Sequence, residues 1–494
     1  MPAYRAAGYE AMIERYSLDV VSDWHRSFVS MESQVHRIEK EEGSIREVYP
    51  ERYWPGESAG EQLEFALKYD GINLSILLSI FEVIDEDELL HHLYSKPTGK
   101  YTRKIWYMYE FLTGKQLPID DMKQGNYINL LEEDRYYTIE KGYTVKRQRI
   151  RNNLLGDSRF CPIVRRTDKI KRLEENNLAD RCREIIAAYP ESLLRRALSY
   201  LYTKETKSSF EIEHIKPSSS RIERFMALLR EAEKEDFCDK ERLIALQNRI
   251  VDPRFRDEDY RKSQNYVGEA VEFGEEKIHY VTPKPEDLDD LMQGLIASHK
   301  LMSRGNVPAL VCAAVIAYGF VYLHPFEDGN GRIHRFLIHN ILAQQALTPK
   351  GIMFPVSAVM LKNPEVYDAS LESFSTKLTP LINYTLNEEG QMSVSNDTGK
   401  WYRYIDMTTQ TEALYEFVLQ TIETELAEEL KFIANYDRAK KAIQEIVDMP
   451  DRQIDLLIRF IFQNHGKLSK SKRKSHFEYL GDKEILQIEQ TVTI

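Results

Sequence analysis

Residues 324–335 read His-Pro-Phe-Glu-Asp-Gly-Asn-Gly-Arg-Ile-His-Arg, and this stretch carries most of the information about the fold. It lies between an apolar run, residues 307–323, and a helical pattern that begins near residue 332. Gly329 and Gly331 allow a turn in which several backbone N–H groups converge, and the following helix N-terminus adds partial positive charge. The sequence therefore predicts an anion-binding turn between two helices.

The side chains around this turn indicate nucleotide chemistry. Arg332 and Arg335 are three residues apart and share one helical face, where two guanidinium groups can hold two phosphates. Asp328 offers hard oxygen ligands suited to Mg²⁺, which commonly accompanies a polyphosphate. His324, a residue type that titrates near neutral pH, is expected to act as the general base toward an incoming hydroxyl. The structural alternative is a helix end, followed by an ordinary loop and by arginines that face solvent. The occurrence of all these residue types within twelve positions favours catalysis.

The same twelve residues resemble the Fic family signature, His-Pro-Phe-x-Asp/Glu-Gly-Asn-Gly-Arg-x-x-Arg, at every specified position. The resemblance covers about residues 205–386 and implies an all-helical enzyme core that transfers AMP from ATP to a hydroxyl side chain of a target protein. It implies His324 as the base and Asp328 as the Mg²⁺ ligand. Gly329, Asn330 and Gly331 would form the anion cradle. Arg332 and Arg335 would bind the outer phosphates.

Residues 266–282 are expected to form a β-hairpin, with two β-prone arms around Phe273-Gly274-Glu275-Glu276. This hairpin resembles the flap of the Fic family. The flap would hold a segment of the target protein by strand addition, because edge backbone groups align a chain without demanding a particular sequence.

A second motif resembles the inhibitory sequence Ser/Thr-x-x-x-Glu-Gly/Asn of some Fic proteins. Here it is formed by Ser209 and Glu213, and His214 stands where the family usually has Gly or Asn. The resemblance implies that Glu213 pairs with Arg335 and so blocks productive binding of the γ-phosphate. The alternative interpretation is a surface glutamate on a helix.

Several other residues have side chains of a type that could serve the site. Tyr367 falls where family members often have an aromatic residue near the adenine, although an aromatic at helical spacing is more often part of a core. His279, His334 and His339 show no metal-ligand spacing and are interpreted as structural.

The helical patterns predict a mainly α protein with a Fic-type helical core, a β-hairpin flap, helical N- and C-terminal regions and a small β-containing insert. The expected regions are a helical N-terminal region at 1–117, the insert at 118–166, the Fic core at 167–388 with an inhibitory helix at 205–216, a linker at 390–400 and a C-terminal helical domain at 401–494. Within the core, helices are expected at about 285–302, 307–323, 332–345 and 364–386.

Composition narrows the classes of partner. The chain has 494 residues, and 67 Lys plus Arg against 79 Asp plus Glu give a net charge of −12, so its overall field does not attract nucleic acid or an anionic membrane. Four scattered cysteines suggest neither a disulfide framework nor a zinc ribbon. The N-terminus lacks a secretory h-region, and the apolar run 307–323 is shorter than the roughly 20 residues of a bilayer span. These features predict a cytoplasmic protein.

The sequence as a whole predicts a protein adenylyltransferase that uses ATP and Mg²⁺, modifies a Ser, Thr or Tyr hydroxyl of a target protein and is autoinhibited by Glu213. Three alternatives stay open, namely removal of AMP with Glu213 aligning a water, transfer of another phosphate-containing group, and a non-catalytic regulator. Such a regulator would bind nucleotide, or nucleic acid through the basic residues 467–474. A nucleic-acid partner is not expected, and the oligomeric state is left open.

Overall fold

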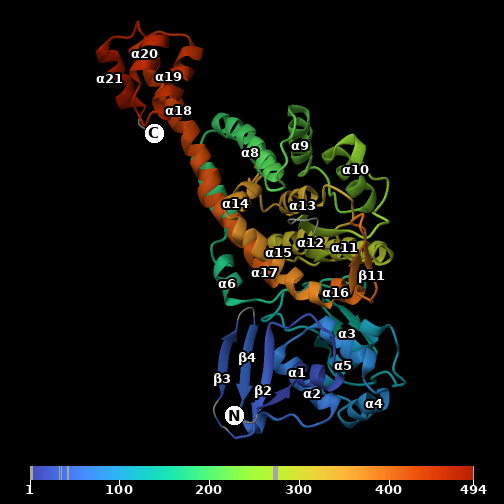
Figure 1. Cartoon of the computed structure of the whole chain (residues 1–494). Helices are drawn as coiled ribbons and strands as arrows, with labels where there is room; N and C mark the ends of the chain where they lie inside the picture. Colours follow the sequence, from blue (N-terminus) through green and yellow to red (C-terminus); the bar gives the residue numbers. More distant parts are fainter. Residues whose placement is uncertain (1–3, 33, 35, 42–43, 271–275, 493–494) are drawn as a thin grey trace. The chain divides into compact units, whose positions relative to one another are not determined.

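The computed structural model describes residues 4–32, 34, 36–41, 44–270 and 276–492, and it confirms a mainly α-helical chain (Figure 1). The chain divides into two compact units. The first unit comprises Met1–Asn176, Pro217–Leu347 and Asn363–Glu416, and the second comprises Asn177–Lys216, Thr348–Lys362 and Phe417–Ile494. The predicted Fic core, residues 167–388, is therefore divided between the two units.

The first unit begins with a four-stranded sheet, which the prediction of a helical region over residues 1–117 did not include. The strands are β1 (Tyr4–Ala7), β2 (His25–Ser30), β3 (Arg37–Glu41) and β4 (Ser44–Tyr49), in the order β1-β2-β4-β3. Strands β2 and β4 are parallel, and the other pairs are antiparallel. Strand β3 reads Arg-Ile-Glu-Lys-Glu, a composition that favours a helix, and pairing with β4 overrides that preference.

Five helices complete the N-terminal part of this unit. They are α1 (Tyr9–Tyr16), α2 (Ala59–Phe65), α3 (Leu74–Val83), α4 (Glu86–Ser95) and α5 (Lys100–Thr113). Their buried side chains form one apolar cluster, which also takes in Tyr404 from a distant part of the chain. Helix α5 ends at Thr113 and is followed by Gly114, whose φ of 68° lies in the left-handed region that commonly terminates a helix.

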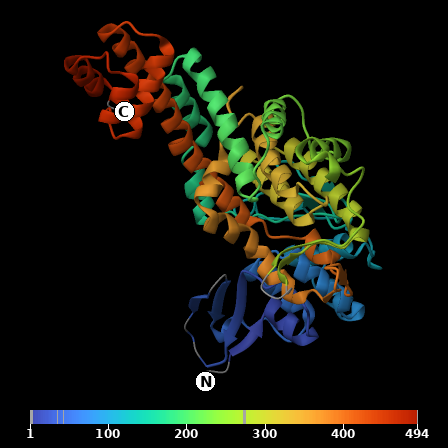
Figure 2. The ribbon, with the colours of Figure 1, turned by 45° about the horizontal axis from the view of Figure 1, so that its top comes forward.

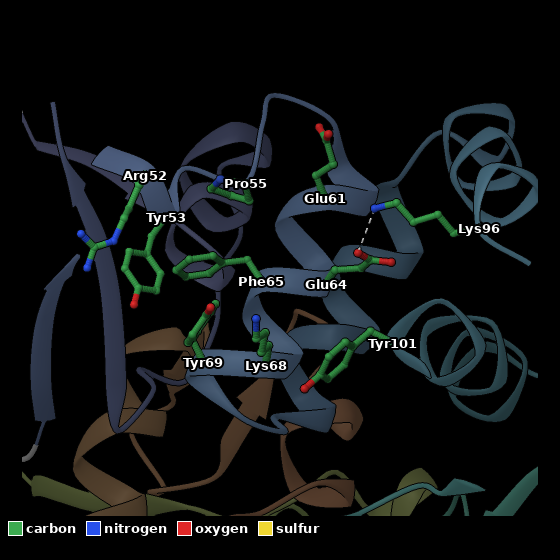
Figure 3. A pocket seen from close by; sticks show the side chains of 10 residues that line it. All are labelled: Arg52, Tyr53, Pro55, Glu61, Glu64, Phe65, Lys68, Tyr69, Lys96 and Tyr101. Atoms are coloured by element: carbon green, nitrogen blue, oxygen red, sulfur yellow. Dashed lines mark hydrogen bonds and ion pairs between the residues drawn. The ribbon is translucent and has the colours of Figure 1, made fainter. Parts of the chain in front are cut away.

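A pocket with an aromatic lining opens beside α2. It has a volume of about 430 Å³, and Figure 3 shows Tyr53, Phe65 and Tyr69 gathered on one side and Tyr101 on the other. The rings of Phe65 and Tyr69 lie 4.6 Å apart, and Lys96 forms an ion pair with Glu64 at 3.2 Å. The Glu64–Lys96 ion pair joins α2 to the residue that follows α4.

The predicted β-containing insert is confirmed. Strands β5 (Ile128–Asn129), β6 (Tyr143–Val145) and β7 (Ile150–Asn152) form a small sheet in the order β5-β7-β6. The backbone around it runs on to Ile163, whose N–H donates to Ile405 O at 3.0 Å. The insert is thereby joined to the later part of the same unit.

The centre of the first unit is built around one buried helix. Its helices are α6 (Asp168–Glu174), α9 (Ser219–Glu231), α10 (Lys240–Ile250), α11 (Pro285–Arg304), α12 (Ala309–Leu323), α13 (Asn330–Gln344) and α15 (Pro364–Leu378). Helix α12 packs against α11 and α13 and is buried on nearly every face, which confirms the predicted core helix (Figures 1 and 2). No helix in the part of the chain that the structure describes is both long enough and apolar enough to traverse a bilayer.

The predicted helix over 364–386 and the linker over 390–400 both need correction. Helix α15 ends at Leu378, and Pro380 follows within a short 3₁₀ turn, because proline lacks the N–H that a continuing helix needs. Strands β10 (Tyr384–Leu386) and β11 (Met392–Val394) then form a hairpin where the linker was expected. The unit continues through α16 (Gly399–Arg403) into α17 (Thr408–Gln420).

The second unit is helical where the structure describes it, as predicted for the C-terminal domain. It contains α7 (Leu178–Ala187), α8 (Glu191–Glu211), α14 (Val356–Lys362), η6 (Thr421–Leu426), α18 (Ala427–Ile446), α19 (Asp451–Gln463), α20 (Lys470–His476) and α21 (Asp482–Thr491). The buried Glu425 carboxylate bonds with both Lys204 and Lys362, which ties α8, α14 and η6 together. A separate apolar cluster closes the unit around α18–α21.

Candidate active site

His324 stands at the end of the buried helix α12. Its φ of 50° lies in the left-handed region, so the chain turns sharply there while the His324 N–H still donates to Phe320 O at 2.9 Å. The imidazole Nδ1 lies 3.2 Å from Val321 O, and a carbonyl can only accept. This contact assigns the proton to Nδ1 and leaves Nε2 as a hydrogen-bond acceptor.

The surroundings of His324 keep its imidazole neutral. Burial is the largest cause that lowers its pKa, the positive charge of Arg261 is the second, and together they bring the pKa to about 4. The Val321 carbonyl and Asp328 act in the opposite direction and are outweighed. At neutral pH the Nε2 atom is therefore free to accept a proton.

Arg261 holds the backbone on both sides of His324, a role that the sequence did not suggest. Its Nε donates to His324 O at 2.8 Å, and its backbone N–H donates to Pro325 O at 2.8 Å. The remaining nitrogens donate to Ser263 O at 2.7 Å and Pro283 O at 2.6 Å. One buried guanidinium thus joins the end of α12 to the two chain segments that lead into and out of the hairpin.

The turn after His324 is closed by Asn330. The N–H of Phe326 donates to Asn330 Oδ1 at 3.0 Å, and Asn330 Nδ2 donates to Phe326 O at 2.7 Å. The Asn330 side chain is therefore used within the turn, and what it can offer to an anion is its backbone N–H in the first turn of α13.

Gly329 supplies the conformation that starts α13. Its φ is 94°, and a Cβ atom at this position would lie 2.9 Å from Val251 Cγ1. A larger residue would meet both backbone strain and this contact. Gly331 lies inside the first turn of α13, and no positive φ is recorded there.

The two arginines of the motif are both buried on α13, with Arg332 at 0% and Arg335 at 2% exposure. Arg332 Nη2 donates to Asp328 Oδ1 at 2.6 Å, and the Asp328 side chain is 42% exposed. An approaching phosphate would meet Arg332 already engaged by a carboxylate, while Asp328 still has surface open to a cation. Arg332 on α13 thus bonds with Asp328 in the turn that follows His324, and the functional roles of the three residues stay predictions.

A second set of side chains supports this turn from α10. Gln247 Nε2 donates to Asp257 Oδ2 at 3.0 Å, and the same carboxylate oxygen accepts from Glu327 N at 3.3 Å. Ser263 Oγ also donates to the Glu327 carboxylate. The sequence offered no signal for these residues, because their bonds join positions up to 70 residues apart.

The predicted hairpin is present as two antiparallel strands, β8 (Tyr266–Ala270) and β9 (Glu276–Val281). The predicted turn lies partly outside the described residues, since 271–275 are not described. Tyr280 OH donates to Tyr322 O at 2.6 Å, which fastens β9 to the last turn of α12. The strand pair is thus anchored directly beside His324.

Metal binding at this site would depend on Asp328. Within residues 4–32, 34, 36–41, 44–270 and 276–492, no three or more His, Cys, Asp and Glu side chains gather so as to hold a metal ion. One partly exposed carboxylate fits an ion such as Mg²⁺ that takes most of its ligands from substrate phosphates and water.

Tyr367 and His334 lie together in the core of the first unit. Tyr367 is 6% exposed, and its ring lies 6.2 Å from that of His334. Burial lowers the pKa of His334 to about 3, so this histidine is neutral and packs against Tyr318 at 4.8 Å. The structural interpretation of His334 agrees with this placement, and the adenine contact of Tyr367 stays a prediction.

The inhibitory motif lies at the end of α8, in the second unit. The predicted helix 205–216 was wrong in its bounds, because α8 begins at Glu191 and ends at Glu211. His214 has a φ of 55°, and Ile215 N donates back to Phe210 O at 3.0 Å, which terminates the helix. Ser209 is buried in the last turn, and Glu213 follows the helix end. Since Glu213 and Arg335 belong to different units, their pairing stays a prediction.

The comparison with protein families gives one match over this site. Residues 237–342 match the Fic/DOC family, a range that includes α10, the hairpin, α11, α12, the His324 turn and nearly all of α13. This segment is a Fic domain. The match begins after Glu213, so the inhibitory motif lies outside it.

Curated relatives of the Fic domain carry the name protein adenylyltransferase Fic. The protein from Aedes aegypti is 30% identical over 119 residues, which are 24% of this chain and 22% of that protein. The protein from Nematostella vectensis is 34% identical over 97 residues, which are 19% of this chain and 20% of that protein. The chain thus spans about a fifth of the length of the curated relatives it matches.

A solved structure of a Fic family protein from Desulfovibrio desulfuricans G20 is also similar. It is 19% identical, with a TM-score of 0.37, over 65% of this chain and 84% of that one. This similarity is too low to locate any residue of the present chain.

Proposed function

We propose that this Fic-domain chain is a protein adenylyltransferase, which transfers AMP from ATP to a Ser, Thr or Tyr hydroxyl of a target protein. The observation that supports this most is the tautomer of His324. Its Nδ1 lies 3.2 Å from Val321 O and its pKa is lowered to about 4, so Nε2 carries no proton at neutral pH and can accept one.

The residues of the chain divide the reaction between them. His324 Nε2 takes the proton of the target hydroxyl as the hydroxyl oxygen attacks the α-phosphorus of ATP, and pyrophosphate leaves. The first-turn N–H groups of α13 and the arginines Arg332 and Arg335 hold the phosphates and stabilise the charge that develops on them. Mg²⁺, held by Asp328, would supply further positive charge to the phosphates.

The hairpin would align the target. Strands β8 and β9 are fastened to α12 by Tyr280 and to the His324 turn by Arg261. A target segment added to a hairpin edge would then lie at a fixed distance from His324.

Glu213 is proposed to inhibit this reaction by competing with the γ-phosphate for Arg335. A carboxylate and a phosphate are both anions that a guanidinium binds in a bidentate way, so occupancy by one excludes the other. The support is the sequence motif, together with its place directly after a helix end.

Incubation of the chain with ATP and Mg²⁺, alone and with cell extract proteins, followed by intact-mass measurement tests the proposal. A gain of one AMP on the chain or on a second protein is expected. His324→Ala should reduce the rate by about 10² to 10⁴ because it removes the general base. His91→Ala is the matched control, since His91 is exposed on α4 and far along the chain from the motif.

The alternatives predict different products. Loss of AMP from a modified protein, or gain of another phosphate-containing mass, would replace AMP transfer by one of the related reactions. Nucleotide binding without any covalent product would indicate a regulator. AMP transfer at the parent rate by His324→Ala would contradict the mechanism.

A further inference from the structure

A second cavity of the first unit lies away from the His324 turn. It has a volume of about 590 Å³ and is lined by four stretches of chain, residues 21–24, 72–75, 163–165 and 373–409, the last contributing residues of α15, α16 and α17. The rings of Trp24, Phe374, Trp401 and Tyr404 form much of its wall. None of its lining residues belongs to the proposed catalytic motif. Its volume is within the range of small-molecule sites.

Asp23 contributes a buried carboxylate to this cavity. It is 7% exposed, and its Oδ1 accepts from Trp24 N at 2.8 Å and Asn73 Nδ2 at 3.2 Å. Its Oδ2 is buried and has no hydrogen-bond partner among the described residues. Burial, followed by the charge of Asp70, raises the pKa of Asp23 to about 7.

Two further polar groups of the lining resemble the Asp23 Oδ2 atom in their burial and in their lack of a partner among the described residues. Trp401 Nε1 and Ser75 Oγ are buried, and within the described parts of the chain neither has a hydrogen-bond partner. A buried polar group left without a hydrogen-bond partner lowers the stability of the fold, and folded proteins contain few of them. Asp23, Trp401 and Ser75 bring three such groups to one cavity, a carboxylate acceptor, an N–H donor and a hydroxyl, and a ligand that bonded with them would remove this cost.

The same cavity has a cationic part. Lys377 and Arg165 both line it. Arg165 lies with its guanidinium carbon 4.1 Å from the ring centroid of Trp24, while its Nε donates to Asp406 at 2.9 Å. An anionic group of a ligand would be attracted to this part, and Lys377 is the cation with which it can pair.

We propose that this cavity binds a nucleotide at a site separate from the Fic active site. A nucleobase is planar and offers N–H donors for Asp23 together with acceptors for Trp401 and Ser75. Its phosphate would pair with Lys377. The proposal goes beyond the AMP-transfer reaction, because binding here requires neither His324 nor the arginines of α13.

The chain offers a direct optical test of this proposal. It has four tryptophans, Trp24, Trp54, Trp106 and Trp401, and two of them line the cavity. Titration with AMP, GMP, ATP and GTP should change the tryptophan emission. Trp24→Phe and Trp401→Phe should each remove a large part of that change, whereas Trp54→Phe should not. An unchanged response in both cavity variants would overturn the proposal.

Equilibrium dialysis separates this site from the catalytic one. In an Arg332→Ala, Arg335→Ala background, which lacks the proposed phosphate ligands of the Fic domain, one labelled nucleotide should still bind per chain. Asp23→Asn and Lys377→Ala should each weaken that binding at least about tenfold. Lys68→Ala, at the pocket of Figure 3, is the matched control and should leave it unchanged.

The outcomes are distinct for the two proposals. Loss of all nucleotide binding in the double-arginine background, with its helical content intact, would show that the cavity holds no nucleotide. Full binding by Asp23→Asn and Lys377→Ala would do the same. Failure of AMP transfer in the parent protein would refute the proposed function, and the dialysis result would be unaffected by it.

Discussion

The rate of AMP transfer should stay high well below pH 6, because the proposed base is kept neutral by its surroundings. An ordinary histidine has a pKa of about 6.5 and is mostly protonated at pH 5. A protonated imidazole cannot accept the hydroxyl proton. Burial and the charge of Arg261 lower the pKa of His324 to about 4. The test is therefore to lower the pH and to measure the initial rate of AMP transfer.

The expected size follows from the two pKa values. With a pKa of about 4, roughly 90% of His324 is neutral at pH 5, whereas a pKa of about 6.5 would leave roughly 3% neutral. The two cases differ about thirtyfold in active base at pH 5. The direction is fixed, since activity is present above the folded-state pKa and is lost as the pH falls through it.

Initial rates of AMP incorporation should be measured from pH 4.5 to 8 at saturating ATP and Mg²⁺, with circular dichroism at each pH to exclude unfolding. The histidine resonances of labelled protein, assigned by His324→Ala, give the His324 pKa without reference to activity. An acid limb near pH 6.5 with the fold intact would refute the argument. A low His324 pKa measured from its resonance, without any transfer activity, would support the described surroundings of His324 but refute its catalytic role.

The remaining predictions concern the residues around the turn and the inhibitory motif. Arg261→Gln should raise the pKa of His324 and move the acid limb to higher pH, because it removes a nearby positive charge, and an unmoved pH profile would contradict this. Asn330→Ala should lower the free energy of unfolding by about 1–3 kcal/mol in urea, since it leaves a buried N–H and C=O of the turn unpaired, and a loss below measurement error would show that the two bonds are dispensable. Glu213→Gly should raise the initial rate of AMP transfer while the control Glu211→Gly should not, and an equal or lower rate in Glu213→Gly would defeat the inhibitory interpretation.

The centre of the fold was predictable because its signals are local. Most of the apolar run 307–323 is a buried helix, since nearly every face of it meets other elements, and the residues after it form a turn in which Gly329 adopts a positive φ. The order helix, turn, helix and the nearby hairpin therefore followed from composition and spacing. The match to the Fic signature added the expected roles of these residues. It did not add their positions in the fold.

The N-terminal sheet and the support of the turn were not predictable because they depend on distant partners. Strand β3 is rich in residues that favour helices, and only the neighbouring β4 makes it a strand. Arg261 likewise looks like an ordinary charged residue in the sequence. Its importance comes from carbonyl groups of Ser263, Pro283 and His324, which one-dimensional spacing does not bring together.

The end of α8 gives a physical reason for the residue types found in the inhibitory motif. The position after Glu213 adopts φ of 55°, the left-handed conformation that commonly ends a helix. Gly and Asn, the residues usual at this position in the family, adopt it most easily, and histidine is also enriched there among the other residues. His214 therefore preserves the helix end that Glu213 follows, because the Ile215 N–H still donates to Phe210 O. Histidine in place of Gly or Asn at position 214 changes a side chain but leaves the backbone conformation next to Glu213 the same. It therefore gives no reason to expect that inhibition is lost.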